Sequence, residues 1–181
     1  MNIANPTSEY PSKLESSGAV ATIPLVSVIL PTYNRAQLFK RSLASVLGQT
    51  FRNIEVIVVD NACTDETSAY LHDFKDLRVK VIRLPKLVGA SAARNAGLAL
   101  AAAELVAFQD DDDIWMPDKL ERQIAALKSA GPTTGLCLCG YIRLIQQGVE
   151  CRYAASYFDE VDFSMGVALR NFSVVATPGG L

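Results

Sequence analysis

The chain has 181 residues, enough for one domain with a sizeable core and too few for two full domains. Half of the residues are hydrophobic, and 17 basic against 19 acidic side chains leave a formal net charge of -2. This balance excludes the basic surface that nucleic-acid binding needs, so no nucleic-acid partner is expected. The sequence has no bilayer-length apolar segment and no signal-peptide pattern. It therefore predicts a cytoplasmic protein, which could reach the inner membrane face only through segments outside this chain.

The cysteines do not form a recognisable zinc or disulfide pattern. Cys63, Cys137, Cys139 and Cys151 fall at no zinc-ligand spacing, and His72 is the single histidine. Cys137 and Cys139 stand two apart in an apolar stretch and share one face of a strand. We expect buried free thiols in a reducing compartment.

Short apolar segments alternate with helical patterns once a polar leader has ended. Residues 1–23 are rich in Ser, Pro, Asn and Thr, which predicts a flexible tail ahead of a domain over residues 24–181. The expected strands are 26–30, 54–59, 79–84, 105–108, 136–145 and 172–176. The expected helices are 37–47, 65–74 with Thr64 as a cap, 90–102, and one from Pro117 to Lys128. The alternation predicts an α/β fold whose mostly parallel sheet is flanked by helices on both faces.

Polar residues follow three of the predicted strands. The first strand runs into Pro31-Thr32-Tyr33-Asn34-Arg35, the second into Asp60-Asn61, and the fourth into Asp110-Asp111-Asp112-Asp113. In a parallel α/β sheet, ligands bind at the carboxyl ends of the strands. We therefore expect the three clusters to form one site.

The four consecutive aspartates indicate a cation. Clustered carboxylates repel one another and are costly to desolvate, and a divalent metal ion offsets both effects. Mg²⁺ and Mn²⁺ prefer oxygen ligands and are commonly held by one or two carboxylates together with substrate phosphates. In an extended segment, Asp110 and Asp112 face one ligand while Asp111 faces elsewhere. A solvated acidic loop is the simpler alternative, but the run lies between an apolar strand and Trp115.

A calcium loop of the EF-hand type is excluded by its own spacing. Asp110, Asp112 and Glu121 match the first, third and twelfth positions of such a loop. Ile114 and Trp115 then occupy the fifth and sixth positions, which need a ligand and a glycine.

Four segments of the chain carry motifs whose order and spacing are informative in combination. The segments are Val26-Ser27-Val28-Ile29-Leu30-Pro31-Thr32-Tyr33-Asn34-Arg35, Ile57-Val58-Val59-Asp60-Asn61-Ala62-Cys63-Thr64-Asp65, Gly89-Ala90-Ser91-Ala92-Ala93-Arg94-Asn95-Ala96-Gly97 and Phe108-Gln109-Asp110-Asp111-Asp112-Asp113-Ile114-Trp115. Together they resemble the motifs of family 2 glycosyltransferases, and the match covers about residues 25–145. The resemblance implies the Rossmann-like GT-A fold and an inverting transferase that uses a nucleotide-sugar, usually a UDP-sugar, with Mn²⁺ or Mg²⁺.

The resemblance also implies roles for individual residues. The implied nucleotide-binding set is Pro31, Thr32, Tyr33, Arg35, Asp60, Arg94, Asp110, Asp111 and Asp112. Within it, Asp60 would accept a hydrogen bond from the base, and Asp110 would bind the ribose. Asp110 and Asp112 would together bind the metal, while Asp111 has no separate role. Asp113 would act on the acceptor or metal side, as a possible catalytic residue. The alternatives are that Tyr33 packs and that Arg94 lies on the surface of its helix.

Some residues in these motifs have simpler interpretations or depart from the family pattern. Asn34 is expected to cap a turn, Gly89 and Gly97 to serve backbone geometry, and Trp115 to pack beneath the site. Gln109 stands where the family has an apolar residue, and Cys63 where serine is usual.

No residue matches the Asp or Glu that inverting members use to deprotonate the acceptor hydroxyl. Asp159, Glu160 and Asp162 are acidic and C-terminal, but they fit no motif. We therefore expect the chain to be the donor-binding part of a longer enzyme. Its saccharide or other hydroxyl acceptors, including lipid-linked ones, would be bound by residues beyond Leu181.

Three other functions share parts of this pattern. A non-catalytic sugar-nucleotide-binding or interaction module with the same fold is the main alternative. A nucleotidyltransferase needs a glycine-rich loop after the first strand, and residues 31–35 contain no glycine, so this function does not fit. A phosphatase with an aspartyl nucleophile needs its aspartates after the first strand, whereas here they follow the fourth, so this function does not fit either.

Overall fold

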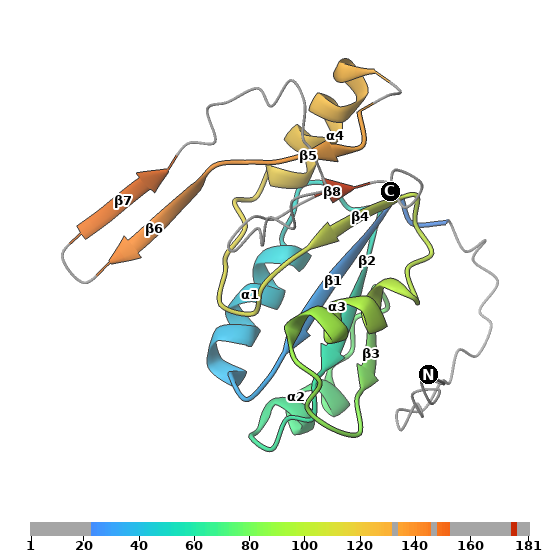
Figure 1. Ribbon diagram of the computed structural model, residues 1–181, viewed down its shortest axis with the longest axis vertical. Coiled ribbons are helices and arrows are strands. Elements are labelled where there is room, and N and C mark those ends of the chain that lie inside the picture. Colours follow the sequence, from blue (N-terminus) through green and yellow to red (C-terminus); the bar gives the residue numbers. More distant parts are fainter. Residues whose placement is uncertain (1–22, 132–133, 146–147, 153–174, 177–181) are drawn as a thin grey trace.

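A computed structural model describes residues 23–131, 134–145, 148–152 and 175–176. The main sheet has the strand order β3-β2-β1-β4-β8-β5. Its strands are β1 (Val26–Thr32), β2 (Ile54–Asp60), β3 (Val79–Arg83), β4 (Leu105–Phe108), β5 (Leu136–Cys137) and β8 (Val175–Ala176). The helices are α1 (Ala36–Leu47), α2 (Thr67–Asp73), α3 (Ala90–Leu98) and α4 (Lys119–Ala130). In Figure 1, β1 runs through the middle of this arrangement.

The first four strands are parallel, which confirms the predicted α/β fold. β1 pairs with β2 and with β4, and β2 pairs with β3, all in parallel register. The registers align Thr32 with Asp60, so the carboxyl ends of β1 and β2 lie side by side. The strand order reverses its direction of growth at β1, where such sheets form a ligand crevice.

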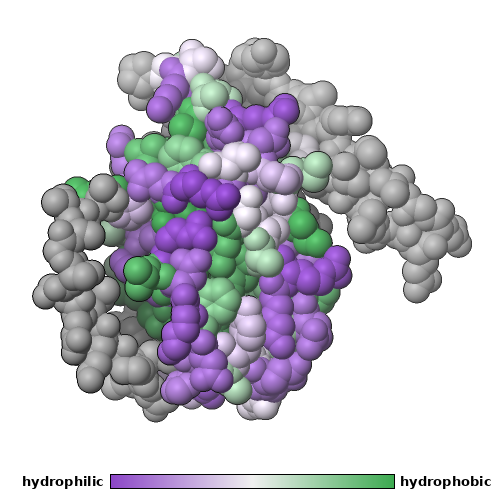
Figure 2. All heavy atoms as spheres, turned by 180° about the vertical axis from the view of Figure 1, so that it is seen from behind, coloured by the Kyte–Doolittle hydropathy of each residue, from purple (hydrophilic) through white to green (hydrophobic). Residues whose placement is uncertain are grey.

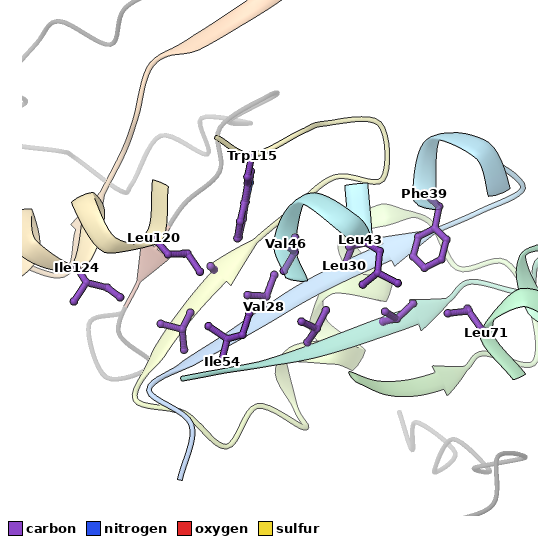
Figure 3. Packing of buried hydrophobic residues seen from close by; sticks show 14 of the residues in the cluster. Val28, Leu30, Phe39, Leu43, Val46, Ile54, Leu71, Trp115, Leu120 and Ile124 are labelled. Atoms are coloured by element: carbon purple, nitrogen blue, oxygen red, sulfur yellow. The ribbon is translucent and has the colours of Figure 1, made fainter. Parts of the chain in front are cut away.

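Alternation along the buried strands sends side chains into two separate layers. Val28 and Leu30 of β1 pack with Phe39 and Leu43 of α1, as Figure 3 shows, and residues of α2 and α4 belong to the same cluster. On the opposite face, Ile29 is in a separate cluster. α3 covers that second face through Ala93 and through Gly97, which contacts β1 and β2. The helices therefore cover both faces, as the sequence predicts.

The predicted segment 136–145 forms two strands in different sheets. β5 joins the main sheet, whereas β6 (Tyr141–Ile145) pairs with β7 (Gly148–Arg152) in a separate hairpin that projects from the body in Figure 1. β8 is antiparallel to both β4 and β5 and lies between them. Of the predicted strand 172–176, only residues 175–176 are described, and residues 1–22 and 153–174 lie outside the description.

Several element boundaries differ from the predictions. β1 continues through Pro31 to Thr32, α3 ends at Leu98, and α4 begins at Lys119, two residues after Pro117. The residue preceding α2 is Glu66, and Thr64 does not cap the helix. Thr64 instead bonds to Asn34 across the neighbouring loop.

The described surface mixes polar and apolar side chains. Hydrophilic and hydrophobic residues are interspersed on the face shown in Figure 2. Among the residues that the structure describes, no helix combines the length and the hydropathy needed to cross a membrane.

Candidate nucleotide-binding site

A pocket of about 320 Å³ opens at the carboxyl ends of β1, β2 and β4 and at the start of α3. Its size falls in the range of small-molecule sites. Eight of the predicted site residues line it: Pro31, Thr32, Tyr33, Arg35, Arg94, Asp110, Asp111 and Asp112. Four more residues line it without a ligand-binding role expected from the sequence: Asn61, Leu87, Gly89 and Ala90.

Two arginines neutralise the aspartates that line the pocket. Arg35 Nη1 lies 3.2 Å from Asp111 Oδ1 and 2.9 Å from Asp112 Oδ2. Arg94 forms an ion pair with Asp110. The side chain of Asp112 is 50% exposed, whereas that of Asp111 is 9% exposed. The pocket therefore places two guanidinium groups beside three carboxylates. The guanidinium groups could bind a diphosphate, and the carboxylates could bind a cation.

Asp111 points into the site, which contradicts the prediction that it faces elsewhere. Its Oδ2 accepts hydrogen bonds from Thr32 Oγ1 at 2.8 Å and from the Tyr33 backbone N–H at 3.4 Å. Burial raises the pKa of Asp111 above its ordinary value, although these hydrogen bonds and Arg35 oppose that rise. The prediction failed because Asp111 and Asp112 form a turn, where the alternation of an extended strand does not apply.

Asp60 is fully buried and does not line the pocket. Its Oδ1 accepts the Cys63 backbone N–H at 2.7 Å. Its Oδ2 accepts the Ser68 hydroxyl at 2.7 Å and lies 3.4 Å from Arg83 Nη1. Asp60 thus holds the loop that follows β2, and the next residue, Asn61, is the one that reaches the pocket.

The loops after β1 and β2 are joined by reciprocal hydrogen bonds. Asn34, at a positive φ of 51°, accepts the Thr64 backbone N–H at 2.7 Å through its Oδ1. In return, Asp65 Oδ2 accepts the backbone N–H of Ala36 at 3.1 Å. Asp65 therefore supplies the cap of α1 from the other loop, while the adjacent Arg35 makes no side-chain cap and remains available to the aspartates.

Asp113 lies beside the pocket without lining it. Burial, reinforced by the charges of Asp110, Asp112 and Asp111, raises the pKa of Asp113 from 3.8 to about 6. Gln109 Nε2 donates to the Asp113 carbonyl at 2.8 Å, so this departure from the family pattern supports the turn that carries the aspartates.

Two glycines position α3 and hence Arg94. Gly89 has a φ of 84°, a backbone conformation that side chains rarely tolerate. A Cβ at Gly97 would lie 2.6 Å from Ile29 Cγ2 and 3.0 Å from Val59 Cγ2. Glycine at this position lets α3 approach the sheet closely enough to bring Arg94 to Asp110, which supports the backbone role expected for both glycines.

The residues at the pocket fit a divalent cation held jointly with a substrate. Asp110 and Asp112 supply oxygen donors to one pocket, both partly exposed. No group of three or more His, Cys, Asp or Glu side chains arranged as a metal site occurs within the described ranges. Mg²⁺ and Mn²⁺ at phosphate sites need only one or two carboxylates, because phosphates and water complete their coordination.

Trp115 and the cysteines at positions 63, 137 and 139 lie outside the set of residues that line the pocket. Trp115 is buried at 5% exposure and belongs to the main core cluster, in agreement with its predicted packing role. Cys63 is buried, and burial raises its pKa to about 12. Cys137 and Cys139 are only half-buried, which differs from the predicted buried thiols, because they lie at the edge strand β5 and just beyond it.

Comparison with known proteins identifies the class to which this fold and pocket belong. The profile of Glycosyl transferase family 2 matches residues 27–143. The chain therefore belongs to this family, and its structural neighbours are glycosyltransferases of the GT-A fold.

Relatives and solved structures agree on this class. The chain is 41% identical over 103 residues to the Escherichia coli UDP-Glc:alpha-D-GlcNAc-diphosphoundecaprenol beta-1,3-glucosyltransferase WfgD, covering 57% of this chain and 41% of that protein. It is 38% identical over 127 residues to the putative teichuronic acid biosynthesis glycosyltransferase TuaG of Bacillus subtilis, covering 69% of this chain and 50% of that protein. The chain thus spans about two-fifths to half of the length of these relatives.

The structure of the Pyrobaculum calidifontis mannosyltransferase PcManGT in complex with GDP-Man and Mn2+ matches with a TM-score of 0.58 and 32% identity, covering 66% of this chain and 36% of that one. S. aureus TarS in complex with UDP-GlcNAc matches with a TM-score of 0.54 and 33% identity, covering 57% of this chain and 31% of that one.

Proposed function

We propose that this chain binds the donor in a metal-dependent glycosyltransferase that moves a sugar from a nucleotide-sugar, a UDP-sugar in the first instance, to a hydroxyl acceptor with inversion. The observation that carries the proposal is the shared pocket of Arg35, Arg94 and the aspartates at residues 110–112. Membership of the family and the similarity to a UDP-glucose-dependent relative support it.

The charges in the pocket suit the departure of a nucleoside diphosphate. Negative charge grows on the diphosphate as the bond to the sugar breaks, and guanidinium groups stabilise such charge through charge-assisted hydrogen bonds. Arg35 and Arg94 would serve this role, while Asp112 and Asp110 would hold Mn²⁺ or Mg²⁺. When bound, that cation supplies Lewis-acid stabilisation of the leaving group. Thr32 and the Tyr33 backbone keep Asp111 fixed beside Arg35, which orients the arginine.

Further parts of the proposal rest on the family and on composition. The transferase domain spans residues 24–181, and the base that deprotonates the acceptor comes from protein outside this chain. Asp113, with its raised pKa, assists on the acceptor or metal side. The acceptor is a saccharide or a lipid-linked hydroxyl, and the protein works in the cytoplasm, reaching the inner membrane face through other segments.

Titration calorimetry with UDP tests the site. In the presence of Mn²⁺, Asp112→Ala should weaken UDP binding about tenfold or more, because an oxygen ligand of the cation and one of the two carboxylates that hold Arg35 are lost together. Asp73→Ala is the matched control, since its side chain is 86% exposed and pairs only with His72 among the contacts described. Equal UDP affinity for the unaltered chain and Asp112→Ala would refute the proposed site.

A further inference from the structure

Two polar side chains are sealed beneath the turn that carries the aspartates. Ser42 of α1 and Gln109, which directly follows β4, are both 0% exposed, and we call them the buried pair. Burial of a polar group costs free energy unless hydrogen bonds replace its contacts with water. The other buried residues of α1, among them Phe39 and Leu43, are apolar. Packing alone therefore does not explain a polar pair at this place.

The buried pair donates hydrogen bonds to two backbone carbonyls. Ser42 Oγ donates to the Asp110 carbonyl at 2.9 Å. Gln109 Nε2 donates to Ser42 Oγ at 2.9 Å and to the Asp113 carbonyl at 2.8 Å. Because a carbonyl oxygen can only accept, the nitrogen of the Gln109 amide must be the atom that faces Asp113. The two side chains thus form one connected hydrogen-bond network with the backbone above them.

The two carbonyls mark the ends of the turn that brings carboxylates to the pocket. The Asp113 backbone N–H donates to the Asp110 carbonyl at 3.2 Å and closes a four-residue turn around Asp111 and Asp112. The buried pair holds the first carbonyl of this turn and the last one. Because Asp110 and Asp112 line the pocket, the position of the turn determines where their carboxylates stand.

α1 anchors the chain that follows the turn through other side chains. Ser45 Oγ accepts the Trp115 backbone N–H at 3.1 Å. Gln49 Nε2 donates to the Met116 carbonyl at 2.7 Å, and Gln49 Oε1 accepts the Leu120 backbone N–H at 3.0 Å. These hydrogen bonds do not involve the buried pair, so a substitution in the pair acts mainly on the turn itself.

We propose that the buried pair positions Asp110 and Asp112 for a divalent cation bound together with the nucleotide, without contacting either ligand. Neither Ser42 nor Gln109 lines the pocket. A cation of this kind holds its oxygen ligands at about 2.0–2.1 Å in a strict geometry, so it tolerates little displacement of the carboxylates. Gln109 replaces the apolar residue usual in the family, so this support is a feature of this chain. The inference rests on the proposed function, because it requires a cation in the pocket.

Calorimetry with UDP, in Mn²⁺ and in EDTA, tests the inference. The unaltered chain should bind UDP about tenfold or more tightly with Mn²⁺ than with EDTA. Ser42→Ala should reduce this gain about fivefold or more, because outer hydrogen bonds at metal sites carry effects of this order, while the affinity in EDTA changes by less than about twofold. Gln109→Met keeps the length of the side chain and removes its amide donors, so the same loss is expected.

Ser27→Ala is the matched control for a purely structural effect. Ser27 is also 0% exposed, and its hydroxyl donates to Glu55 and accepts the Ala103 backbone N–H. It lies near the amino end of β1, whereas the pocket lies at the carboxyl end. Loss of this hydroxyl should lower the stability of the protein and leave the gain from Mn²⁺ that of the unaltered chain.

The double variant, Ser42→Ala with Gln109→Met, separates positioning from stability. Replacement of both polar partners by apolar side chains leaves no buried hydroxyl or amide unpaired between them, so this variant should be more stable in urea than Ser42→Ala alone. Its gain from Mn²⁺ should nevertheless stay as low as in the single variants. The double variant therefore provides a folded protein for the measurement if a single variant unfolds.

The outcomes separate the two proposals. Absence of UDP binding to the unaltered chain, or equal binding in Mn²⁺ and in EDTA, would contradict the proposed metal-dependent function and remove this inference with it. An unchanged gain from Mn²⁺ in the folded variants would overturn the positioning role and leave the nucleotide site standing. A loss of the same size in Mn²⁺ and in EDTA would do so as well, because it would reflect a general disturbance of the pocket.

Discussion

Arg35 donates a hydrogen bond of 2.9 Å to Asp112 while the same nitrogen lies 3.2 Å from Asp111. One guanidinium group thus holds two adjacent carboxylates that would otherwise repel each other. The side chain of Arg35 is half-exposed. Arg35 therefore holds Asp111 and Asp112 in place, and in the proposed function the same guanidinium group would also contact the diphosphate.

Replacement of Arg35 should therefore affect binding more than folding. We expect Arg35→Ala to weaken UDP binding with Mn²⁺ about tenfold, because a charge-assisted hydrogen bond to phosphate is lost. Calorimetry measures the change, and Arg41→Ala, an exposed arginine of α1, is the matched control. Unchanged UDP affinity in Arg35→Ala would show that Arg35 serves only the aspartates.

Asp113 should lower the stability of the protein at neutral pH. In the unfolded chain this carboxyl ionises near 3.8, whereas in the folded chain it holds its proton up to about 6. The folded state binds more protons between these values, so its stability falls as pH rises from about 4 to about 6. Asp113→Asn removes the charge and should raise the free energy of unfolding at pH 7.5 by about 1 kcal/mol, after allowance for screening by water.

Thermal unfolding without added metal, at pH 4 and at pH 7.5, measures this effect. The gain for Asp113→Asn should appear at pH 7.5 and nearly vanish at pH 4. Asp73→Asn, at an exposed carboxylate, should show no such pH dependence. A gain of equal size at both pH values would mean that the Asp113 charge is not its source.

Gly97 should be intolerant of even one added methyl group. In Gly97→Ala the new Cβ meets Ile29 at 2.6 Å and Val59 at 3.0 Å, and both are strand residues that cannot easily move. We expect a loss of about 1–3 kcal/mol in urea unfolding and weaker UDP binding, because α3 carries Arg94. Gly89→Ala is an instructive comparison: its Cβ would meet nothing within 4 Å, so its cost comes only from the positive φ.

Asp60 should prove to be a structural residue. Asp60→Ala leaves the Cys63 backbone N–H and the Ser68 hydroxyl without their buried acceptor. We expect a loss of about 2–4 kcal/mol of stability, measured by urea unfolding. UDP affinity in the presence of Mn²⁺, measured by calorimetry on the folded variant, should stay close to that of the unaltered chain, because Asp60 does not line the pocket. A large loss of UDP affinity in folded Asp60→Ala would instead assign ligand contact to Asp60.

Residue pattern predicted the parallel core of the fold well. β1, β2, β3 and β4 are runs of β-branched and apolar residues, and a strand buried on both faces needs little more than such a run. The insertion of β8 between β4 and β5 could not be foreseen, because two residues carry too little pattern and their partners lie far away in the sequence.

The sequence predicted which residues gather at the candidate site, but not the direction in which each side chain points. Thr32, Arg35, Arg94 and Asp110 were all expected at one site from the order of the motifs, and all four line the pocket. Two details of the pocket differ from the expectations. Asp111 turns inward because the chain bends after β4, and Asn61, for which no ligand contact was expected, lines the pocket whereas Asp60 does not. Where a strand ends, the direction of the next side chain depends on the local backbone dihedral angles, which the spacing of residues in the sequence does not specify. The Val88 backbone N–H donates to Asn61 Oδ1, and this contact joins residues 27 positions apart in the sequence.

The position of β8 also has a consequence for the order of folding. Among the strands that the structure describes, β5 pairs only with β8 in the main sheet, and β8 comes about 40 residues later in the chain. On the ribosome, strands β1 to β4 can pair as soon as they emerge, while β5 must wait for residues 175–176. A nascent chain halted before residue 175 should hold four parallel strands whose β4 edge is open, and this edge is where chaperones or other chains would first bind.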